Sequence, residues 1–282
     1  MDLKFYLNKK CLITGAASGI GRSVAILLGK NGAELFLTDI DEVKLKETEN
    51  EIFNHNGKVV FSKALDIRSY EEVKNFADII HDNFGSMDIV MNIAGIAIWG
   101  EVGKMSHEDW KKIIDVNLMG PIHIIECFIP PMMEKKNGGN LVNVSSAAGL
   151  FGLPWHGAYS ASKFGLRGLS DVLRHDLKKY KIRLHLVCPG AVDTGLVESI
   201  KVSGMKISEE QFKILKKRFQ GHAVSPDQAA LSILKGIENK DYLIFTSTDI
   251  QLGYWGQRKF TFIYDWVMQK MNELFQKALM GK

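Results

Sequence analysis

Ser146, Tyr159 and Lys163, within "SSAAGLFGLPWHGAYSASKFG", have the types and spacing needed for proton transfer at an alcohol or carbonyl oxygen. Tyr159 and Lys163 stand four residues apart in a helical pattern, so they share one helix face. A phenol has a pKa of about 10, so proton transfer near neutrality needs that pKa lowered by about 3, or roughly 4 kcal/mol. A neighbouring ammonium favours the phenolate. We therefore expect Lys163 to lower the pKa of Tyr159, and Ser146, at a strand end, to donate to the substrate oxygen.

Asn117, in "DWKKIIDVNLMGPIHII", is a fourth candidate. A buried amide in an otherwise amphipathic helix is costly unless it is paired. Taken singly, Asn117 could be a structural amide in a kinked helix, Ser146 a strand-end cap, and Tyr159 with Lys163 a surface pair. Their combination, in this order and on these elements, favours a catalytic set.

The segment "TGAASGIG" places Gly15, Gly19 and Gly21 between an apolar run and a helical pattern. It is not a Walker loop, because no Lys-Ser or Lys-Thr follows the last glycine, and its spacing differs from G-x-G-x-x-G. Glycines here permit a tight turn, close approach of the backbone to a pyrophosphate, and close packing of helix on strand. The amides at the helix N-terminus then point at the phosphates. We expect a dinucleotide site.

Asp39 ends the next apolar run, about 20 residues after the glycines, where an acid accepts hydrogen bonds from the adenosine ribose hydroxyls. A 2′-phosphate would meet a like charge there. Ile40 follows where an arginine would help NADP, and Ser18 rather than a basic residue precedes Gly19. The alternative role of Asp39 is a helix N-cap, which Asp41 fills better. We therefore predict that the protein prefers NAD(H) over NADP(H).

Strand and helix patterns alternate along the chain, which predicts a parallel sheet covered on both faces. The expected strands are 11–15, 34–39, 58–67, 88–95, 140–146, 182–190 and 242–247, and the expected helices are 20–31, 42–55, 71–84, 109–127, 155–180 and 226–239. Helix starts are marked by Ser69 with Glu72, by Ser106 with Asp109, and by Ser225 before Pro226. Seven strands in one winding predict a single doubly wound α/β domain, 1–248, followed by an extension, 249–282.

Composition excludes several classes of protein. The chain has 282 residues, 46% of them hydrophobic, and a net charge of +4 with acidic and basic residues intermixed, which argues against nucleic-acid binding. Three scattered cysteines, Cys11, Cys127 and Cys188, fit free thiols in a reducing compartment, and none belongs to a metal-ligand cluster. No secretion signal or membrane span is indicated, so we expect a cytoplasmic protein without a metal.

Together these motifs resemble the short-chain dehydrogenase/reductase family in its compact form. The matching segments, spanning about residues 8 to 248, are "TGAASGIG", "ALDI", "NIAG", Asn117, Ser146, "YSASK" and "CPGAVDT". Ile93 stands where the family usually has a small residue. The resemblance implies a catalytic tetrad of Asn117, Ser146, Tyr159 and Lys163, with Asn117 positioning a water that links Lys163 to solvent.

The resemblance also implies the cofactor-binding residues. Asp66 would contact the adenine, residues 92–95 would support the central strand beside the cofactor, Lys163 would bind the nicotinamide ribose, and Val192 with Thr194 would hold the nicotinamide amide. The full predicted set is Gly15, Ser18, Gly19, Ile20, Gly21, Asp39, Asp66, Ile67, Asn92, Ala94, Gly95, Tyr159, Lys163, Pro189, Gly190, Val192 and Thr194.

The expected activity is hydride transfer between NAD(H) and a secondary alcohol or ketone. Large apolar residues beside the motifs favour a hydrophobic substrate such as a steroid, retinoid or acyl lipid, although core packing explains any one of them equally well. The predicted substrate pocket comprises Trp99, Ala148, Leu153, Trp155 and Leu196. Two alternatives stay open: an NADPH-dependent 3-oxoacyl or lipid-ketone reductase, and a nucleotide-sensing binding protein without turnover.

Two further segments surround this site. Residues 195–222 are expected to form a substrate lid, with a helix opened by Ser208 and Gln211. Residues 256–282 show apolar residues at helical spacing, which predicts one amphipathic helix. It could pack on its own domain or a sister subunit, cover the substrate entrance, or lie on a membrane surface. Family analogy suggests a homodimer or homotetramer.

Overall fold

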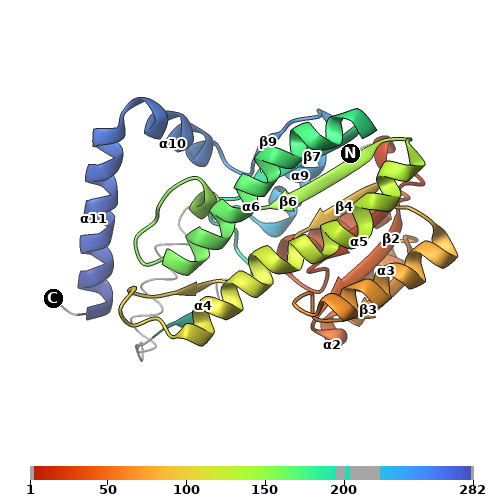
Figure 1. The fold of residues 1–282 in the computed structure, drawn as a ribbon, viewed down its shortest axis with the longest axis horizontal. Coiled ribbons are helices and arrows are strands. Elements are labelled where there is room, and N and C mark those ends of the chain that lie inside the picture. Colours follow the sequence, from red (N-terminus) through yellow and green to blue (C-terminus); the bar gives the residue numbers. More distant parts are fainter. Residues whose placement is uncertain (1–2, 195–200, 204–222, 281–282) are drawn as a thin grey trace.

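The protein is seen here in a computed structural model that describes residues 3–194, 201–203 and 223–280. Seven parallel strands form one sheet in the order β3-β2-β1-β4-β6-β7-β9, which confirms the predicted doubly wound architecture (Figure 1). The strands are β1 (Lys10–Thr14), β2 (Glu34–Asp39), β3 (Lys58–Ala64), β4 (Ile89–Asn92), β6 (Gly139–Val144), β7 (Ile182–Cys188) and β9 (Leu243–Phe245).

The strand order reverses between β1 and β4, and this is where an open α/β sheet binds its ligand. Several expected strands end earlier than the sequence pattern suggested. Residues 65–67 after β3, 93–95 after β4 and 145–146 after β6 lie beyond the ladder. The motif residues therefore occupy loops at the carboxyl edge of the sheet.

Helices cover both faces. On one face α1 (Gly19–Lys30) packs against α2 (Glu42–Asn54) and α9 (Pro226–Glu238), and their apolar side chains share one buried cluster with β1 and β2. On the other face lie α3 (Tyr70–Phe84), α4 (His107–Ile114), α5 (Gly120–Lys135) and α6 (Gly157–Asp176) (Figure 1). Phe76 of α3 and Phe128 of α5 belong to the second large cluster.

The long helix expected over 109–127 is longer and is interrupted. A π-helical turn, η2 (Asp115–Met119), separates α4 from α5 and contains Asn117. The whole run His107–Lys135 is long and apolar enough to cross a membrane by length and composition, whereas the sequence pattern indicated no such stretch. Ile124 and Phe128 are nevertheless fully buried against the sheet, so this run is a core helix of the fold.

The serine caps predicted at Ser69, Ser106 and Ser225 are present, and the one predicted at Ser208 lies outside the described residues. Ser225 and Gln228 form a complete capping box, and Ser69 and Ser106 each accept the backbone N–H three residues on. The side chain of Asp109 does not complete a box with Ser106. Its carboxylate instead accepts a hydrogen bond of 2.7 Å from the Ser203 hydroxyl.

A second, two-stranded parallel sheet was not expected from the sequence. It pairs β5 (Ile98–Trp99) with β8 (Lys201–Val202), and each strand is too short to give a periodic signal. The Ser203 N–H donates to the Trp99 carbonyl at 2.7 Å, which continues the pairing. This contact fixes residues 201–203 beside Trp99, whereas the predicted lid helix with Ser208 and Gln211 lies outside the described residues.

The C-terminal extension forms two helices instead of the single one predicted over 256–282. They are α10 (Thr248–Lys259) and α11 (Thr261–Met280). Phe260 separates them, because its backbone (φ −131°, ψ 65°) leaves the helical region. The extension lies at the end of the molecule opposite β3 and α2, beside the chain that leads into α6 (Figure 1).

Candidate active site

The glycine turn is packed so closely that it has no room for side chains. Gly15 has φ +72°, and a Cβ there would lie 2.8 Å from the Ala94 Cα. A Cβ on Gly21 would lie 2.0 Å from the Gly15 carbonyl oxygen. Ser18 is the N-cap of α1 but makes no side-chain cap, so a ligand anion can meet the first amides of the helix. This bare turn at the strand-order reversal fits a dinucleotide pyrophosphate.

Thr14, at the end of β1, joins the turn to the end of β4. Its hydroxyl accepts the backbone N–H groups of Ile93 and Ala94, each at 3.1 Å. The sequence reading passed over Thr14. The sequence does show a hydroxyl residue directly before the first glycine, at a predicted strand end. In the structure this hydroxyl is buried and serves as the hydrogen-bond acceptor that the strand end needs.

Asp39 faces the glycine turn. Its carboxylate accepts the Ala17 N–H at 2.9 Å and the Asp41 N–H at 3.0 Å. Asp41 caps α2 by accepting the Lys44 N–H at 3.1 Å, so the helix cap is Asp41 and not Asp39, as expected. Ile40 beside it is 68% exposed and brings no positive charge. The glycine turn thus has a carboxylate beside it and no neighbouring positive charge from Ile40.

The residues predicted to contact the adenine or to support the central strand contact other side chains of the protein. Asp66 forms an ion pair with Arg68, whose side-chain hydrogen bond holds the pKa of Asp66 below its usual range. Ile67 packs against Gly120, where a Cβ would lie 2.5 Å from the Ile67 Cδ1. The Asn92 amide donates to the Asn143 side chain at 2.9 Å. The buried Oδ1 of Asn92 has no partner within the part of the chain that the structure describes.

The segment after β7 lies beside the glycine turn. Gly19 of the turn is close to Thr194, because a Cβ on Gly19 would lie 3.0 Å from the Thr194 Cγ2. Val192 pairs with Val224, and the Pro189 carbonyl accepts the Ala147 N–H at 2.7 Å. Gly190 donates its N–H to the Thr246 hydroxyl at 3.3 Å. The predicted cofactor residues of this segment therefore lie between the turn and the Ser146 loop.

Ser146, Tyr159 and Lys163 come together at the carboxyl edge of the sheet. Ser146 follows β6, is the N-cap of the short 3-10 helix η3 (Ala147–Gly149), and hydrogen-bonds the Tyr159 side chain. The Lys163 Nζ lies 5.9 Å from the centre of the Tyr159 ring and donates to the Val144 carbonyl at 3.0 Å. The structure thus groups the three side chains that the sequence placed 13 and 17 residues apart from Ser146.

The pKa values of this group differ from the sequence expectation. Burial raises the pKa of Tyr159, and the Ser146 hydrogen bond opposes that rise only in part. Burial also lowers the pKa of Lys163 to about 8. The prediction that Lys163 lowers the pKa of Tyr159 is therefore not met in this structure. The physical reason is desolvation of both groups, with the ammonium hydrogen-bonded to a carbonyl.

Asn117 holds the loop that approaches Lys163. Its Oδ1 accepts the Ile96 N–H and its Nδ2 donates to the Ile96 carbonyl, both at 2.9 Å. A Cβ on Gly95 would lie 3.2 Å from the Asn117 Oδ1 and 3.3 Å from the Lys163 Nζ. Asn117 is thus the paired amide of a distorted helix, as the structural alternative predicted, and it also lies near Lys163.

The predicted substrate residues divide into two groups. Trp99 is buried and its ring centre lies 4.5 Å from that of His156, whose ring centre lies 6.3 Å from that of Tyr159. The Ala148 N–H donates to the Ser146 hydroxyl at 3.1 Å, so Ala148 lies beside the Ser146, Tyr159 and Lys163 group. Leu153 instead packs with Leu150 and Phe151 towards the C-terminal extension, and Leu196 lies outside the described residues. Trp155 hydrogen-bonds the extension.

His156 is the residue that the sequence reading missed. It precedes Tyr159 by three residues within the quoted motif region, and its ring packs at a tilt against the Trp99 ring (43°) and near the Tyr159 ring (59°). Its Nδ1 lies 2.6 Å from the Pro154 carbonyl, and burial lowers its pKa to about 4. A polar residue in an apolar run just before a predicted catalytic tyrosine was the available signal.

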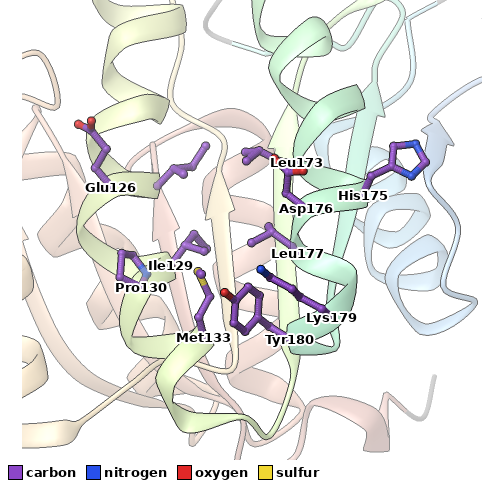
Figure 2. A pocket seen from close by; sticks show the side chains of 11 residues that line it. Glu126, Ile129, Pro130, Met133, Leu173, His175, Asp176, Leu177, Lys179 and Tyr180 are labelled. Atoms are coloured by element: carbon purple, nitrogen blue, oxygen red, sulfur yellow. The ribbon is translucent and has the colours of Figure 1, made fainter.

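A separate hollow of about 640 Å³ lies between α5 and the end of α6 (Figure 2). Ile129 and Met133 of α5 face Leu173 and Tyr180 across it. None of the predicted catalytic, cofactor or substrate residues lines it. The reaction site is therefore defined by the side chains at the sheet edge and not by this hollow.

Cys11, Cys127 and Cys188 are free thiols, and burial raises the pKa of Cys188 to about 12. Within residues 3–194, 201–203 and 223–280, no group of three or more His, Cys, Asp or Glu side chains is placed to hold a metal ion.

A glycine turn at the reversal of a doubly wound sheet, facing a Ser-Tyr-Lys group across the same edge, defines an oxidoreductase that works with a nicotinamide dinucleotide. Residues 9–203 match the family model described as short chain dehydrogenase. The chain belongs to the short-chain dehydrogenase/reductase family and is an NAD(P)-dependent dehydrogenase or reductase.

Two relatives come from Thermotoga maritima. An "uncharacterized oxidoreductase" is 38% identical over 199 residues, which cover 70% of this chain and 78% of the relative. A 3-oxoacyl-(acyl-carrier-protein) reductase is 34% identical over 193 residues, covering 68% and 78% respectively.

Two solved structures illustrate the cofactor question. A Burkholderia phymatum short chain dehydrogenase/reductase in complex with NAD has a TM-score of 0.82 and 26% identity, covering 90% of this chain and 94% of its own. A metagenomic short-chain oxidoreductase in complex with NADP has a TM-score of 0.68 and 27% identity, covering 85% and 96%. Similar chains thus bind either cofactor.

Proposed function

We propose that this protein transfers a hydride between NAD(H) and a secondary alcohol or ketone of a hydrophobic substrate. The observation that carries the proposal is the grouping of Ser146, Tyr159 and Lys163 at the sheet edge that faces the glycine turn. When bound, the nicotinamide supplies or accepts the hydride. The predicted cofactor residues, from Gly15 in the turn to Thr194 after β7, would hold it.

The proton is handled by this chain's own side chains. In the reduction, the Tyr159 hydroxyl gives its proton to the substrate oxygen as the carbonyl carbon gains the hydride, and in the oxidation it takes that proton back. Ser146, already hydrogen-bonded to Tyr159, orients the same oxygen. Burial keeps Tyr159 protonated, which suits its role as the acid in reduction. Lys163 supplies the neighbouring positive charge while its ammonium is protonated, which holds below a pH of about 8.

Substitution of Tyr159 by Phe tests the mechanism. It removes the transferable proton with little change in volume, so turnover should fall about 10²- to 10⁴-fold. The dissociation constant for NADH should stay close to that of the parent protein. Near-normal turnover by Tyr159→Phe on a good substrate would show that another group transfers the proton.

Two observations support the substrate and cofactor assignments. Trp99 and the His156 ring form a buried aromatic layer beside Tyr159, and these apolar surroundings support an apolar substrate. The carboxylate of Asp39 faces the glycine turn and supports NAD(H) over NADP(H). A steroid, retinoid and acyl-compound panel with NADH and NADPH would identify the substrate class.

The second candidate is an NADPH-dependent 3-oxoacyl or lipid-ketone reductase. The T. maritima 3-oxoacyl-(acyl-carrier-protein) reductase that this chain resembles favours it. The two candidates differ in cofactor, so the dissociation constants for NADH and NADPH decide between them. Cofactor binding without turnover on a broad alcohol and ketone panel would instead favour a non-catalytic sensing protein.

We also propose a cytoplasmic homodimer or homotetramer. The three free thiols support the reducing compartment, and the apolar hollow between α5 and α6 supports a contact with a second copy of the chain (Figure 2). Light scattering at several concentrations would measure the oligomeric state.

A further inference from the structure

Two hydrogen bonds join helix α11 of the extension to the loop 150–156, which leads from η3 into α6. The Tyr264 hydroxyl accepts the Gly152 N–H at 2.8 Å. The Asn272 Oδ1 accepts the Trp155 indole N–H at 3.1 Å. Tyr264 and Asn272 are eight residues apart, so they lie about two turns from each other on one side of the helix.

Apolar contacts accompany these bonds. The Tyr264 ring centre lies 6.5 Å from that of Phe151, and both residues belong to a cluster with Leu150 and Cys188. A Cβ on Gly253 of α10 would lie 3.2 Å from the Phe151 ring. Both α10 and α11 therefore pack against the loop 150–156.

The loop adopts a backbone conformation that its sequence disfavours. Trp155 has φ +68°, a left-handed value that is unusual for a bulky residue and persists only where the surroundings enforce it. The Trp155 carbonyl accepts the Gly100 N–H at 2.8 Å, and its indole donates to Asn272. One side of this residue is thus held by the β5 segment and the other by α11.

The next residue along the loop is His156, whose ring centre lies 4.5 Å from that of Trp99 and 6.3 Å from that of Tyr159. Any change in the backbone at Trp155 moves the His156 ring and the entry into α6. The contact with α11 therefore acts on the wall of the site next to Tyr159, while the glycine turn and Asp39 lie at the other end of the cleft.

We infer that Tyr264 and Asn272 are positioning residues: through Gly152 and Trp155 they hold the loop 150–156 in the conformation that sets the His156 ring beside Tyr159, and so determine substrate binding. The substrate part of this inference rests on the proposed function. The extension thereby completes the substrate side of the site and leaves the cofactor side unchanged.

Three variants test the inference against a matched control. Asn272→Leu removes the acceptor for the Trp155 indole, Asn272→Asp keeps an acceptor oxygen there, and Tyr264→Phe removes the acceptor for the Gly152 N–H. Gln269→Leu makes the same kind of polar-to-apolar change at an exposed position of α11. Thermal unfolding of each variant checks that the fold is intact.

The first readout is hydrogen exchange of the amides in 150–158, which needs no substrate. Exchange should become about tenfold faster in Asn272→Leu and Tyr264→Phe, as expected for loss of one hydrogen bond, and should stay at the parent rate in Asn272→Asp and Gln269→Leu. Unchanged exchange in the first two variants would overturn the inference.

The second readout is kinetic. KM for the best ketone or alcohol should rise about tenfold in Asn272→Leu and Tyr264→Phe, with kcat and the NADH dissociation constant close to those of the parent, and Asn272→Asp should restore KM. A KM in Asn272→Asp as high as that in Asn272→Leu, or faster exchange without any change in KM, would overturn it. A parent protein that binds NADH but turns over no substrate would defeat the proposed function, and loop exchange would still decide whether α11 holds the loop.

Discussion

The carboxylate of Asp39 accepts a hydrogen bond of 2.9 Å from the Ala17 N–H, so the acid that ends β2 is fixed against the glycine turn. This places a negative charge where an adenosine ribose would lie. We expect NADH to bind more tightly than NADPH, because a 2′-phosphate would meet a like charge. Asp39→Ala combined with Ile40→Arg should reduce the ratio of the two dissociation constants by about tenfold or more, or about 1.4 kcal/mol.

The matched control for that experiment is Asp41→Ala. Asp41 lies two residues further on and caps α2. Its loss removes the cap on the Lys44 N–H, so it should lower the free energy of unfolding and leave the cofactor ratio unchanged. Equal affinity of the parent protein for NADH and NADPH, measured by fluorescence titration, would show that the assigned role of Asp39 is wrong.

Raising the pH from 8 to about 10.4 should raise the stability of the folded protein and lower its activity, because Lys163 loses its charge over this range. Burial lowers its pKa to about 8 in the folded protein, while in the unfolded chain the pKa stays near 10.4. Below pH 8 both states are protonated, and the buried ammonium costs the folded state about 3 kcal/mol. As pH rises from 8 to about 10.4 the folded protein releases its proton first, so this cost disappears.

Lys163→Met removes the buried charge and the hydrogen bond to Val144, which is worth about 1 kcal/mol. We therefore expect the variant to be more stable than the parent by about 2 kcal/mol at pH 7, with a difference that shrinks towards pH 10. Its turnover should fall sharply. Denaturant unfolding at a series of pH values measures the difference, and a difference that does not change with pH would refute the assigned pKa.

The sequence predicted the sheet, its strand number and the grouped motif residues, because parallel strands bring their carboxyl ends to one edge. Local spacing within one or two elements determines two of these patterns: the run from Gly15 to Asp39, and the pair Tyr159 and Lys163. Local spacing is what a single sequence displays most clearly.

What the sequence did not predict depends on contacts between distant segments. The π-helical turn at Asn117 exists because the amide bonds the backbone at Ile96, 21 residues earlier. The raised pKa of Tyr159 follows from burial, which spacing does not reveal. The break at Phe260 and the contact of Asn272 with Trp155 arise from packing of the extension, for which the pattern only suggested a single helix.

Gly21 should be essential for cofactor binding. A Cβ there would lie 2.0 Å from the Gly15 carbonyl oxygen, which is backbone and cannot rotate away. Gly21→Ala must open the turn, so we expect NADH affinity to fall by about 100-fold or more, or about 3 kcal/mol. Circular dichroism and fluorescence titration together separate loss of binding from loss of folding.

The control for Gly21 is Gly168→Ala, on the exposed side of α6, where a Cβ meets no atom within 4 Å. This change should raise the free energy of unfolding by about 0.5–1 kcal/mol through helix propensity and leave NADH binding unchanged. Binding by Gly21→Ala within about threefold of the parent would contradict the assignment of the turn, since threefold corresponds to less than 1 kcal/mol.

His156 should make the protein sensitive to acid. Burial lowers its pKa to about 4, compared with about 6.5 in the unfolded chain. Above pH 6.5 the imidazole of His156 is neutral in both the folded and the unfolded state, so it does not change the free energy of unfolding. Between pH 6.5 and 4 the unfolded state takes up the proton first, so the free energy of unfolding falls by about 3 kcal/mol. His156→Gln carries no titrating group, so it should lose less stability than the parent over this range. Denaturant unfolding at pH 7, 5.5 and 4.5 measures the two slopes, and identical slopes would place the titration of His156 outside this window.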